Sequence, residues 1–307
     1  MTEPADDGTA DEFSSLAEVA DELGLDRRAI PRVTRRSAEV DEGQQLSFLA
    51  WGGAEPELVF LHGGGQNAHT WDLVALDLGR PAIAIDLPGH GHSSWRPDRD
   101  YGPVRNAAAV AAVVEQFAGH ARGVVGMSLG GLTTIRLAST RPDLVRRAVL
   151  VDVTPGSAEA AQRMTSEQRG AVELTRGPRA FASLEEMVEA AVRASPRRPP
   201  SAVRRGVIHN ARQLPDGTWA WRYDLRGSGP GAPLPGFRPL WDDLGTLTMP
   251  VMLVKGGDSA FVTAADLAEV TRRLPSVRTE IVAGAGHAVQ SDQPTALSDL
   301  IRDFILS

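Results

Sequence analysis

The clearest pattern along the chain is a series of short, fully apolar runs, each followed by a glycine-rich or polar loop and then by a helical segment. Buried parallel strands look like this because helices cover both of their faces. These runs predict strands at residues 58–61, 82–85, 123–125, 148–153 and 251–254, with a weaker sixth at 278–282. Helical spacing of apolar residues predicts helices at 104–117, 129–139, 264–274 and 294–305. The predicted fold class is α/β, with a mostly parallel sheet flanked by helices.

The N-terminal region departs from this alternation. Residues 1–12 form an acidic tail, and apolar residues at helical spacing predict a short amphipathic helix within 13–25. Two strand-like stretches, 32–40 and 45–51, are separated by the turn signal Asp41-Glu42-Gly43 and predict a hairpin.

The alternation also stops between Val153 and Pro250. This interval contains two helical stretches, at 184–194 and 202–212, and a tryptophan-rich segment at 218–223. We interpret it as a mainly helical cap inserted over the carboxyl edge of the sheet, where open α/β sheets bind their ligands. The predicted organisation is a tail and helix at 1–25, a core made of 26–154 and 241–307, and a cap at 155–240.

Composition narrows the classes of function. The chain of 307 residues is 42% hydrophobic and 23% charged, the balance of a globular protein with a substantial core. Its formal charge of −7 argues against a nucleic-acid or anionic-membrane surface, so a small molecule is the expected partner. The absence of cysteine excludes disulfides, thiolate zinc sites and cysteine nucleophiles. With no signal-like N-terminus and no run of about 18 apolar residues, we expect a cytoplasmic protein.

The sharpest chemical signal is Gly126-Met127-Ser128-Leu129-Gly130, which follows an apolar run and opens a helical segment. It has the G-x-S-x-G pattern of a nucleophile elbow in the context that this motif requires. Small residues are needed there because the serine lies on a strained strand-to-helix turn. Ser128 is the predicted nucleophile.

A glycine loop, His62-Gly63-Gly64-Gly65, follows an early predicted strand. Such a loop lets backbone amides approach a substrate carbonyl, as an oxyanion hole requires. We predict the amides of Gly64 and Leu129 as the donors, and we expect His62 to shape the loop rather than to transfer protons.

A histidine and two aspartates complete the set of candidate catalytic residues. His287 lies in the loop after the last predicted strand and is the predicted base. Asp258 follows residues 251–254 in a glycine-rich loop from which its side chain can reach His287, whereas Asp152 is flanked by valines. We predict Asp258 as the acid and expect Asp152 to fix the start of the cap through backbone hydrogen bonds.

Together these motifs, with Asp86-Leu87-Pro88-Gly89-His90-Gly91-His92-Ser93, resemble the α/β-hydrolase family from about Leu46 to the C-terminus. Within it, the chain is similar to the capped serine esterases and C–C-bond hydrolases. The resemblance implies a Ser128–His287–Asp258 triad, an acyl-enzyme formed from an ester-like substrate, and no metal or organic cofactor. Related enzymes with a carboxylate nucleophile are disfavoured because the elbow carries serine. A C–C-bond hydrolase, a cofactor-free perhydrolase and a non-catalytic ligand-binding protein remain the alternatives.

Further residues are candidates for contact with the substrate. They lie in the glycine loop, near the elbow, in the cap and after Asp258: Gly65, Trp95, Met127, Phe181, Met187 and Val262. Structural roles are expected for His90 and His92, because no third ligand has metal-binding spacing.

Overall fold

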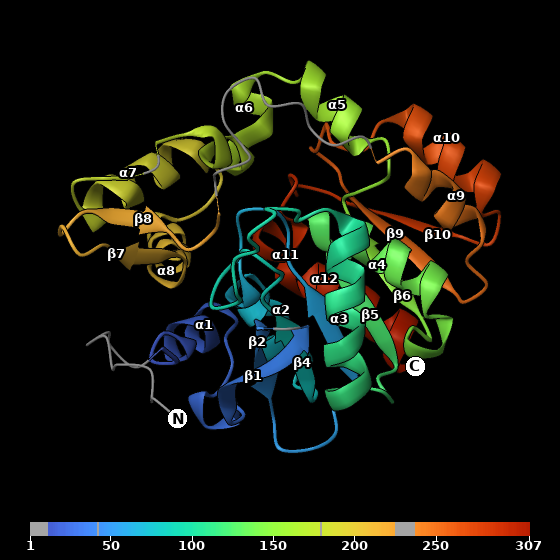
Figure 1. Ribbon diagram of the computed structural model, residues 1–307, viewed down its shortest axis with the longest axis horizontal. Helices are drawn as coiled ribbons and strands as arrows, with labels where there is room; N and C mark the ends of the chain where they lie inside the picture. Colours follow the sequence, from blue (N-terminus) through green and yellow to red (C-terminus); the bar gives the residue numbers. More distant parts are fainter. Residues whose placement is uncertain (1–11, 42, 179, 225–236) are drawn as a thin grey trace.

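The computed structural model describes residues 12–41, 43–178, 180–224 and 237–307, and an eight-stranded sheet lies at its centre (Figure 1). The strand order is β1-β2-β4-β3-β5-β6-β9-β10. β1 and β2 form the predicted hairpin, β2 pairs antiparallel with β4, and all other pairs are parallel. The strands are β1 Val33–Asp41, β2 Gln44–Trp51, β3 Leu58–Leu61, β4 Ala82–Ile85, β5 Gly123–Met127, β6 Ala148–Val151, β9 Val251–Gly256 and β10 Arg278–Val282. The predicted α/β class is confirmed.

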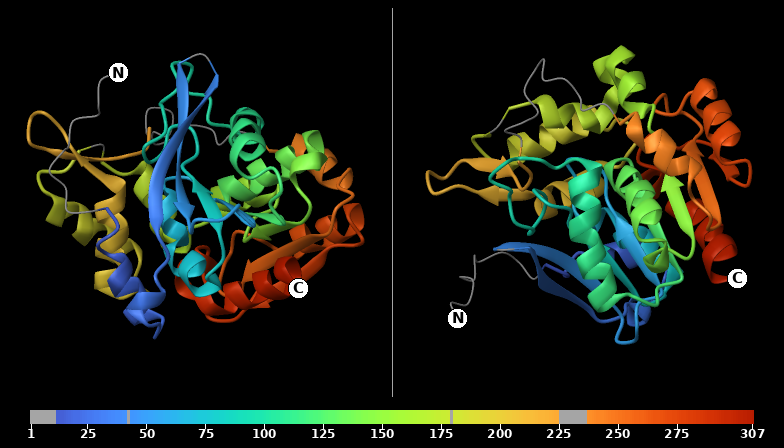
Figure 2. Two further views of the ribbon diagram at one scale, coloured as in Figure 1. Left: turned by 90° about the horizontal axis from the view of Figure 1, so that it is seen from below. Right: turned by 45° about the vertical axis from the view of Figure 1, so that its right-hand side comes forward.

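The side chains of the apolar strands contribute to two hydrophobic layers, one on each face of the sheet. Successive side chains of a strand point to opposite faces, so in β3 Val59 and Leu61 join one layer while Leu58 and Phe60 join the other. Helices cover both faces (Figure 2). The first layer is closed by α3 Pro103–Phe117, α4 Leu129–Thr140, α9 Pro239–Gly245 and α10 Ala264–Arg273, and the second by α1 Leu16–Glu22, α2 Asp72–Leu78, α11 Val289–Asp292 and α12 Pro294–Ile301.

The predicted core helices agree with the structure except near the C-terminus. Helix α12 ends at Ile301 and continues as the π-helical turn η6, Arg302–Leu306, instead of remaining α-helical to residue 305. The short core helices α2, α9 and α11 were not predicted; α2 is only 7 residues long and is followed by Gly79 in the left-handed conformation. Short 3-10 turns complete the core: η1 Arg27–Ala29, η2 Ala68–Trp71 and η3 Pro142–Leu144.

The segment between β6 and α9, which we call the cap, forms an arch over the core in Figure 1. It contains α5 Ser157–Arg163, α6 Ser166–Arg169, the 3-10 helix η4 Gly170–Arg176, α7 Leu184–Ala194, α8 Pro200–Asn210, and the two-stranded sheet of β7 Ala211–Gln213 and β8 Trp219–Trp221. The predicted helix at 202–212 therefore ends at Asn210 and gives way to β7. The cap has a hydrophobic core of its own, built around Phe181, Met187 and Trp221.

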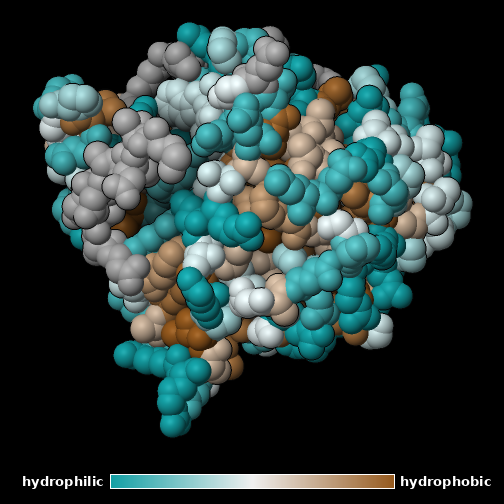
Figure 3. Space-filling view, turned by 60° about the horizontal axis from the view of Figure 1, so that its bottom comes forward, coloured by the Kyte–Doolittle hydropathy of each residue, from teal (hydrophilic) through white to brown (hydrophobic). Residues whose placement is uncertain are grey.

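On the face drawn in Figure 3, hydrophobic patches alternate with hydrophilic side chains. Such a mixture is usual for the surface of a globular protein. Among the described helices, none has the length and apolar character needed to cross a membrane.

Candidate active site

Ser128 lies on the sharp turn between β5 and α4 that its motif predicts. Its backbone has φ 50° and ψ −117°, a region that non-glycine residues rarely occupy. A Cβ atom on Gly126 would lie 2.4 Å from the Gly130 carbonyl oxygen, and one on Gly130 would lie 2.2 Å from that of Leu61. Both positions therefore require glycine. The turn places the serine at the carboxyl end of the sheet and at the N-terminus of α4.

His287 lies against Ser128. It belongs to the loop between β10 and α11, and its Nε2 atom is 3.1 Å from the Ser128 hydroxyl oxygen. Its Nδ1 atom is 2.7 Å from Oδ2 of Asp152. The side chains of His287 and Asp152 are 11% and 0% exposed, so the base is held by a carboxylate that water does not reach. This is the hydrogen-bond chain of a nucleophile, a base and an orienting acid.

The prediction that Asp258 orients His287 is wrong in this geometry. The glycine-rich turn carries Asp258 outward, where its half-exposed carboxylate pairs with Arg197 of the cap at 2.8 Å. Asp152 instead directly follows β6, the strand next to β5, and has φ 49°, a strained conformation that it shares with Ser128 and, among described non-glycine residues, with Arg99.

Two further donors hold the Asp152 carboxylate. The Gly256 amide donates to Oδ1 at 2.9 Å, and the Ser259 hydroxyl donates to Oδ2. The sequence suggested that Asp152 fixes the start of the cap. Its carboxylate instead accepts these two hydrogen bonds and contacts His287. A signal did exist in the sequence, because Asp152 directly follows a buried strand, as Ser128 does.

The end of β9 and the loop that follows it contact both the acid and the base. Lys255 donates to the carbonyl oxygens of Gly256, at 2.7 Å, and Ser259, at 3.1 Å. Phe261 stacks on the imidazole of His287 with ring centroids 3.7 Å apart. Sequence reasoning missed Ser259 and Phe261, since neither belongs to a recognisable motif.

The glycine loop lies beside the elbow. A Cβ atom on Gly63 would be 3.2 Å from Cβ of Ser128, so the backbone of this residue passes close to the serine. The Gly63 amide is engaged by the Gln66 side chain at 3.0 Å. Gly64 is exposed and Leu129 is the first residue of α4; within the described part of the chain, neither amide has a protein acceptor. Both amides are therefore available as donors.

His62 shapes this loop, as predicted. Its Nδ1 atom donates to the Gly63 carbonyl at 2.7 Å, and its Nε2 atom accepts from the Leu87 amide at 2.9 Å, which fixes a neutral tautomer. Burial, reinforced by the neighbouring His90, lowers the pKa of His62 to about 3. His90 is likewise buried, with Nδ1 at 3.0 Å from the Pro88 carbonyl oxygen, and burial lowers its pKa. Neither histidine is placed to exchange protons with a substrate.

The cap reaches the glycine loop directly. Asn210, the last residue of α8, donates from Nδ2 to the Gly65 carbonyl at 2.7 Å. Gly65 has φ 74°, and a Cβ atom there would lie 2.6 Å from Cγ2 of Thr175. The loop is therefore clamped between core and cap.

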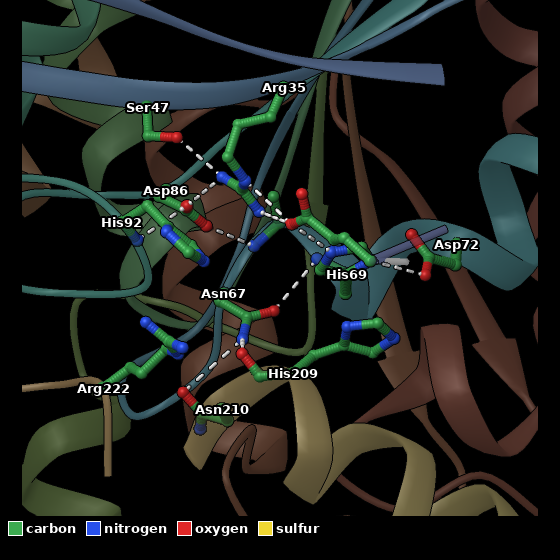
Figure 4. A network of polar contacts seen from close by, with 12 residues as sticks. Arg35, Ser47, Asn67, His69, Asp72, Asp86, His92, His209, Asn210 and Arg222 are labelled. Atoms are coloured by element: carbon green, nitrogen blue, oxygen red, sulfur yellow. Dashed lines mark hydrogen bonds and ion pairs between the residues drawn. The ribbon is translucent and has the colours of Figure 1, made fainter. Parts of the chain in front are cut away.

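A buried network around Asp86 lies beside the start of η2, which follows the glycine loop in the chain (Figure 4). Asp86, just past β4, accepts from Arg35 at 2.7 Å, from the Ala68 amide at 2.7 Å and from the His92 amide at 3.0 Å. Burial alone would raise the pKa of Asp86, but the Arg35 guanidinium and the amide donors hold it below its usual range. The backbone amide of His92 thus helps to hold Asp86, which is a structural role, as was expected for this residue.

His69 and Asp72 form a second buried aspartate–histidine pair next to this network (Figure 4). Asp72 Oδ2 is 2.8 Å from Nδ1 of His69, Glu12 is 3.0 Å from Nε2, and the ring of His209 stacks on that of His69 at 3.7 Å. Burial opposes charging, yet the two carboxylates raise the pKa of His69 to about 9. Burial, with the neighbouring His69 charge, lowers that of His209 to about 4.

This cluster is the group of described residues whose spacing comes nearest to a metal site. The candidate ligand atoms of His69, Asp72 and His209 lie within 4.8 Å of one another. However, both nitrogens of His69 already face carboxylates, and stacked rings direct their in-plane lone pairs along parallel planes. The cluster is an imidazolium held between two carboxylates, and it joins the N-terminal segment, the core and the cap.

The predicted substrate contacts do not share one environment. Phe181 and Met187 are buried inside the hydrophobic core of the cap, so the prediction that they face the substrate is corrected: they hold the cap together. Trp95 packs under the Arg212 guanidinium, 4.7 Å from its ring centroid. Met127 lies beneath Gly63, and Val262 is buried beside Phe261.

These features define the class of protein. The model of the alpha/beta hydrolase family matches residues 58–300, and the chain belongs to this family. It is an enzyme fold with a serine, a histidine and an aspartate aligned at the carboxyl end of the sheet.

The chain is also similar to individual proteins of known name and structure. The chain is 49% identical over 297 residues to the esterase Rv0045c of Mycobacterium tuberculosis, covering 96% of each protein. A solved structure from work on transition metal inhibition and structural refinement of that esterase superposes with a TM-score of 0.85 and 48% identity, over 97% of this chain and 99% of the other. The chain is also 29% identical over 280 residues to 2-(acetamidomethylene)succinate hydrolase of Mesorhizobium japonicum, covering 88% of this chain and 95% of that protein.

Proposed function

We propose that this protein is a serine esterase that cleaves an ester-like bond of a small molecule through an acyl-enzyme. The observation that carries the proposal is the hydrogen-bond chain from Ser128 through His287 to Asp152. The strong similarity to a bacterial esterase supports the same reaction class.

The geometry supports the following steps. His287 removes the proton of Ser128 as the hydroxyl oxygen attacks the ester carbonyl, and buried Asp152 stabilises the imidazolium that forms. The amides of Gly64 and Leu129 donate to the oxyanion. His287 then protonates the leaving alcohol, and a water molecule, activated by the same histidine, releases the acid and restores Ser128.

The cap is the proposed source of the substrate pocket. It follows Asp152 in the chain, contacts the glycine loop through Asn210, and covers the carboxyl end of the sheet. The negative net charge of −7 agrees with a small-molecule substrate rather than a polyanion.

The nucleophile is tested with a fluorophosphonate probe and a panel of simple esters. The probe should label the native protein, while Ser128→Ala should lose labelling and at least about 10³-fold of turnover. Ser139→Ala, on the same helix but bonded to Asp243, is the matched control and should keep both. Chelators should leave the rate unchanged. Ordinary turnover by Ser128→Ala would contradict the assignment.

A wider panel separates the alternatives. Esters, thioesters, lactones and diketones should be compared under multiple-turnover conditions, and addition of peroxide tests perhydrolysis. Turnover confined to diketones would indicate a C–C-bond hydrolase. Tight retention of a ligand without turnover would indicate a binding protein.

A further inference from the structure

Phe261 contacts the base but has no place in the proposed proton transfers. It is 5% exposed and lies in the loop after β9, with its ring at 17° to the imidazole plane of His287. At a centroid distance of 3.7 Å, one face of the imidazole is covered by the aromatic ring. The stack restricts rotation of the imidazole and places a π-face over the ring that becomes positively charged.

The remaining surroundings of Phe261 come largely from the cap. Its ring belongs to a small hydrophobic cluster with Ala161 of α5 and with Met164, the residue that ends this helix; Ala160 and Val172 pack against the same cluster. This cluster is separate from the two core layers and from the inner core of the cap. Movement of α5 would therefore change the packing around the ring of Phe261.

The backbone of Phe261 is tied to the acid. Its amide donates to the Ser259 hydroxyl at 3.2 Å, and that hydroxyl in turn donates to Asp152. One short loop thus orients the carboxylate through Ser259 and covers the imidazole through Phe261.

We propose that Phe261 is a positioning residue that couples the cap to His287: its ring holds the imidazole in line with Ser128, and α5 and Met164 hold the ring. This inference rests on the proposed function of Ser128, His287 and Asp152. It assigns the cap a role in aligning the base in addition to forming the pocket.

The test is the pH dependence of kcat/KM for a simple ester, whose acid limb reports protonation of the base in the free enzyme. Phe261→Leu fills similar space but removes the π-face that favours the imidazolium, so the acid limb should move down by about 0.5 to 1 pH unit. We expect kcat to fall by roughly 3- to 30-fold with little change in KM, because alignment of the base matters in the transition state. Phe261→Tyr keeps the aromatic ring, so its acid limb should lie at the same pH as that of the native protein.

Two comparisons separate positioning from packing. Phe48→Leu removes a fully buried aromatic side chain of β2 and should lower stability without moving the acid limb. Met164→Ala should move the limb in the same direction as Phe261→Leu but less, and the double variant should show less than the sum of the two shifts. The charged neighbours of the His287 loop, Asp152, Asp292 and Arg197 of the cap, are unchanged in every variant.

The outcomes are distinguishable from failure of the proposed function. If the native protein is labelled at Ser128 but Phe261→Leu keeps the native pH profile and kcat, Phe261 is a packing residue and the inference is wrong. If Met164→Ala and Phe261→Leu act additively, the coupling to the cap is wrong. If the native protein is not labelled at all, the proposed function itself fails.

Discussion

The protein contains two buried aspartate–histidine pairs of almost the same local geometry, and only one of them is built for catalysis. Asp152 lies 2.7 Å from Nδ1 of His287, and Asp72 lies 2.8 Å from Nδ1 of His69. The difference is at the opposite nitrogen. In the first pair Nε2 faces the Ser128 hydroxyl, whereas in the second it faces the Glu12 carboxylate.

The comparison shows that a carboxylate alone does not make histidine a base. Two carboxylates raise the pKa of His69 to about 9, so this residue stays protonated near neutral pH and has no lone pair to offer. His287 has one carboxylate and a hydroxyl that can give up its proton. The second pair therefore stabilises the fold, where it links the N-terminal segment to η2 and α2.

The largest expected effect separates the two aspartates by activity. Asp152→Asn removes the charge that stabilises the imidazolium and should lower turnover by on the order of 10³- to 10⁴-fold. Asp72→Asn should lower the turnover of folded protein by less than about tenfold. Steady-state kinetics on both variants, with folding checked by circular dichroism, makes the comparison; the reverse ranking would contradict the assignment of the acid.

Asp72→Asn should act mainly on stability. Asp72→Asn leaves the His69 imidazolium with one carboxylate fewer in a buried site and should cost about 3 kcal/mol of unfolding free energy, since removing one partner of a buried pair is strongly destabilising. Asp143→Asn, in an exposed pair with Arg141, is the control and should cost less than about 1 kcal/mol. Chemical denaturation measures both, and equal losses would mean that the buried pair contributes no more than a surface one.

The His69 pair also predicts how stability depends on pH. Its pKa is raised in the folded state, so its contribution is fully present below the unfolded value of about 6.5 and is lost as pH rises through about 9. Between these values the slope should approach about 1.4 kcal/mol per pH unit at most. In His69→Gln, the unfolding free energy measured by chemical denaturation should vary less with pH in this window. An unchanged slope of unfolding free energy against pH would show that His69 is not the group responsible.

The smallest effect concerns Asp258. Its pair with Arg197 is half exposed on both sides, so Asp258→Asn should change stability by no more than about 1 kcal/mol, and turnover by less than about threefold. Raising the salt concentration should weaken the native pair and reduce even this difference. A loss of activity comparable to that of Asp152→Asn would restore Asp258 as the acid.

The sequence predicted the scaffold better than the details of the site. Strands such as β3 and β4 are buried on both faces and therefore appear as continuous apolar runs, and the glycine pattern around Ser128 reflects contacts that a side chain would make impossible. The choice between Asp152 and Asp258 was different in kind. It depended on a positive φ at Asp152 and on donors from Gly256 and Ser259, which are distant along the chain or belong to no motif.

The cap illustrates a second limit of the sequence. Phe181 and Met187 had the size and hydrophobicity of pocket residues, but an inserted segment must also bury apolar surface of its own. Hydrophobic side chains that form an internal core and those that face a ligand have the same composition. Only the packing against Trp221 distinguishes them here.

Lys255 gives the molecule an unusual practical property, because it is the single lysine of the sequence. Its ammonium group donates to the carbonyls of Gly256 and Ser259, the two residues whose amide and hydroxyl hold Asp152. A reagent that acylates lysine would remove the charge and loosen this loop without touching Ser128, His287 or Asp152. Inactivation by an amine-directed reagent, or by coupling to an amine-reactive support, would therefore not identify a catalytic lysine, and immobilisation is better directed elsewhere.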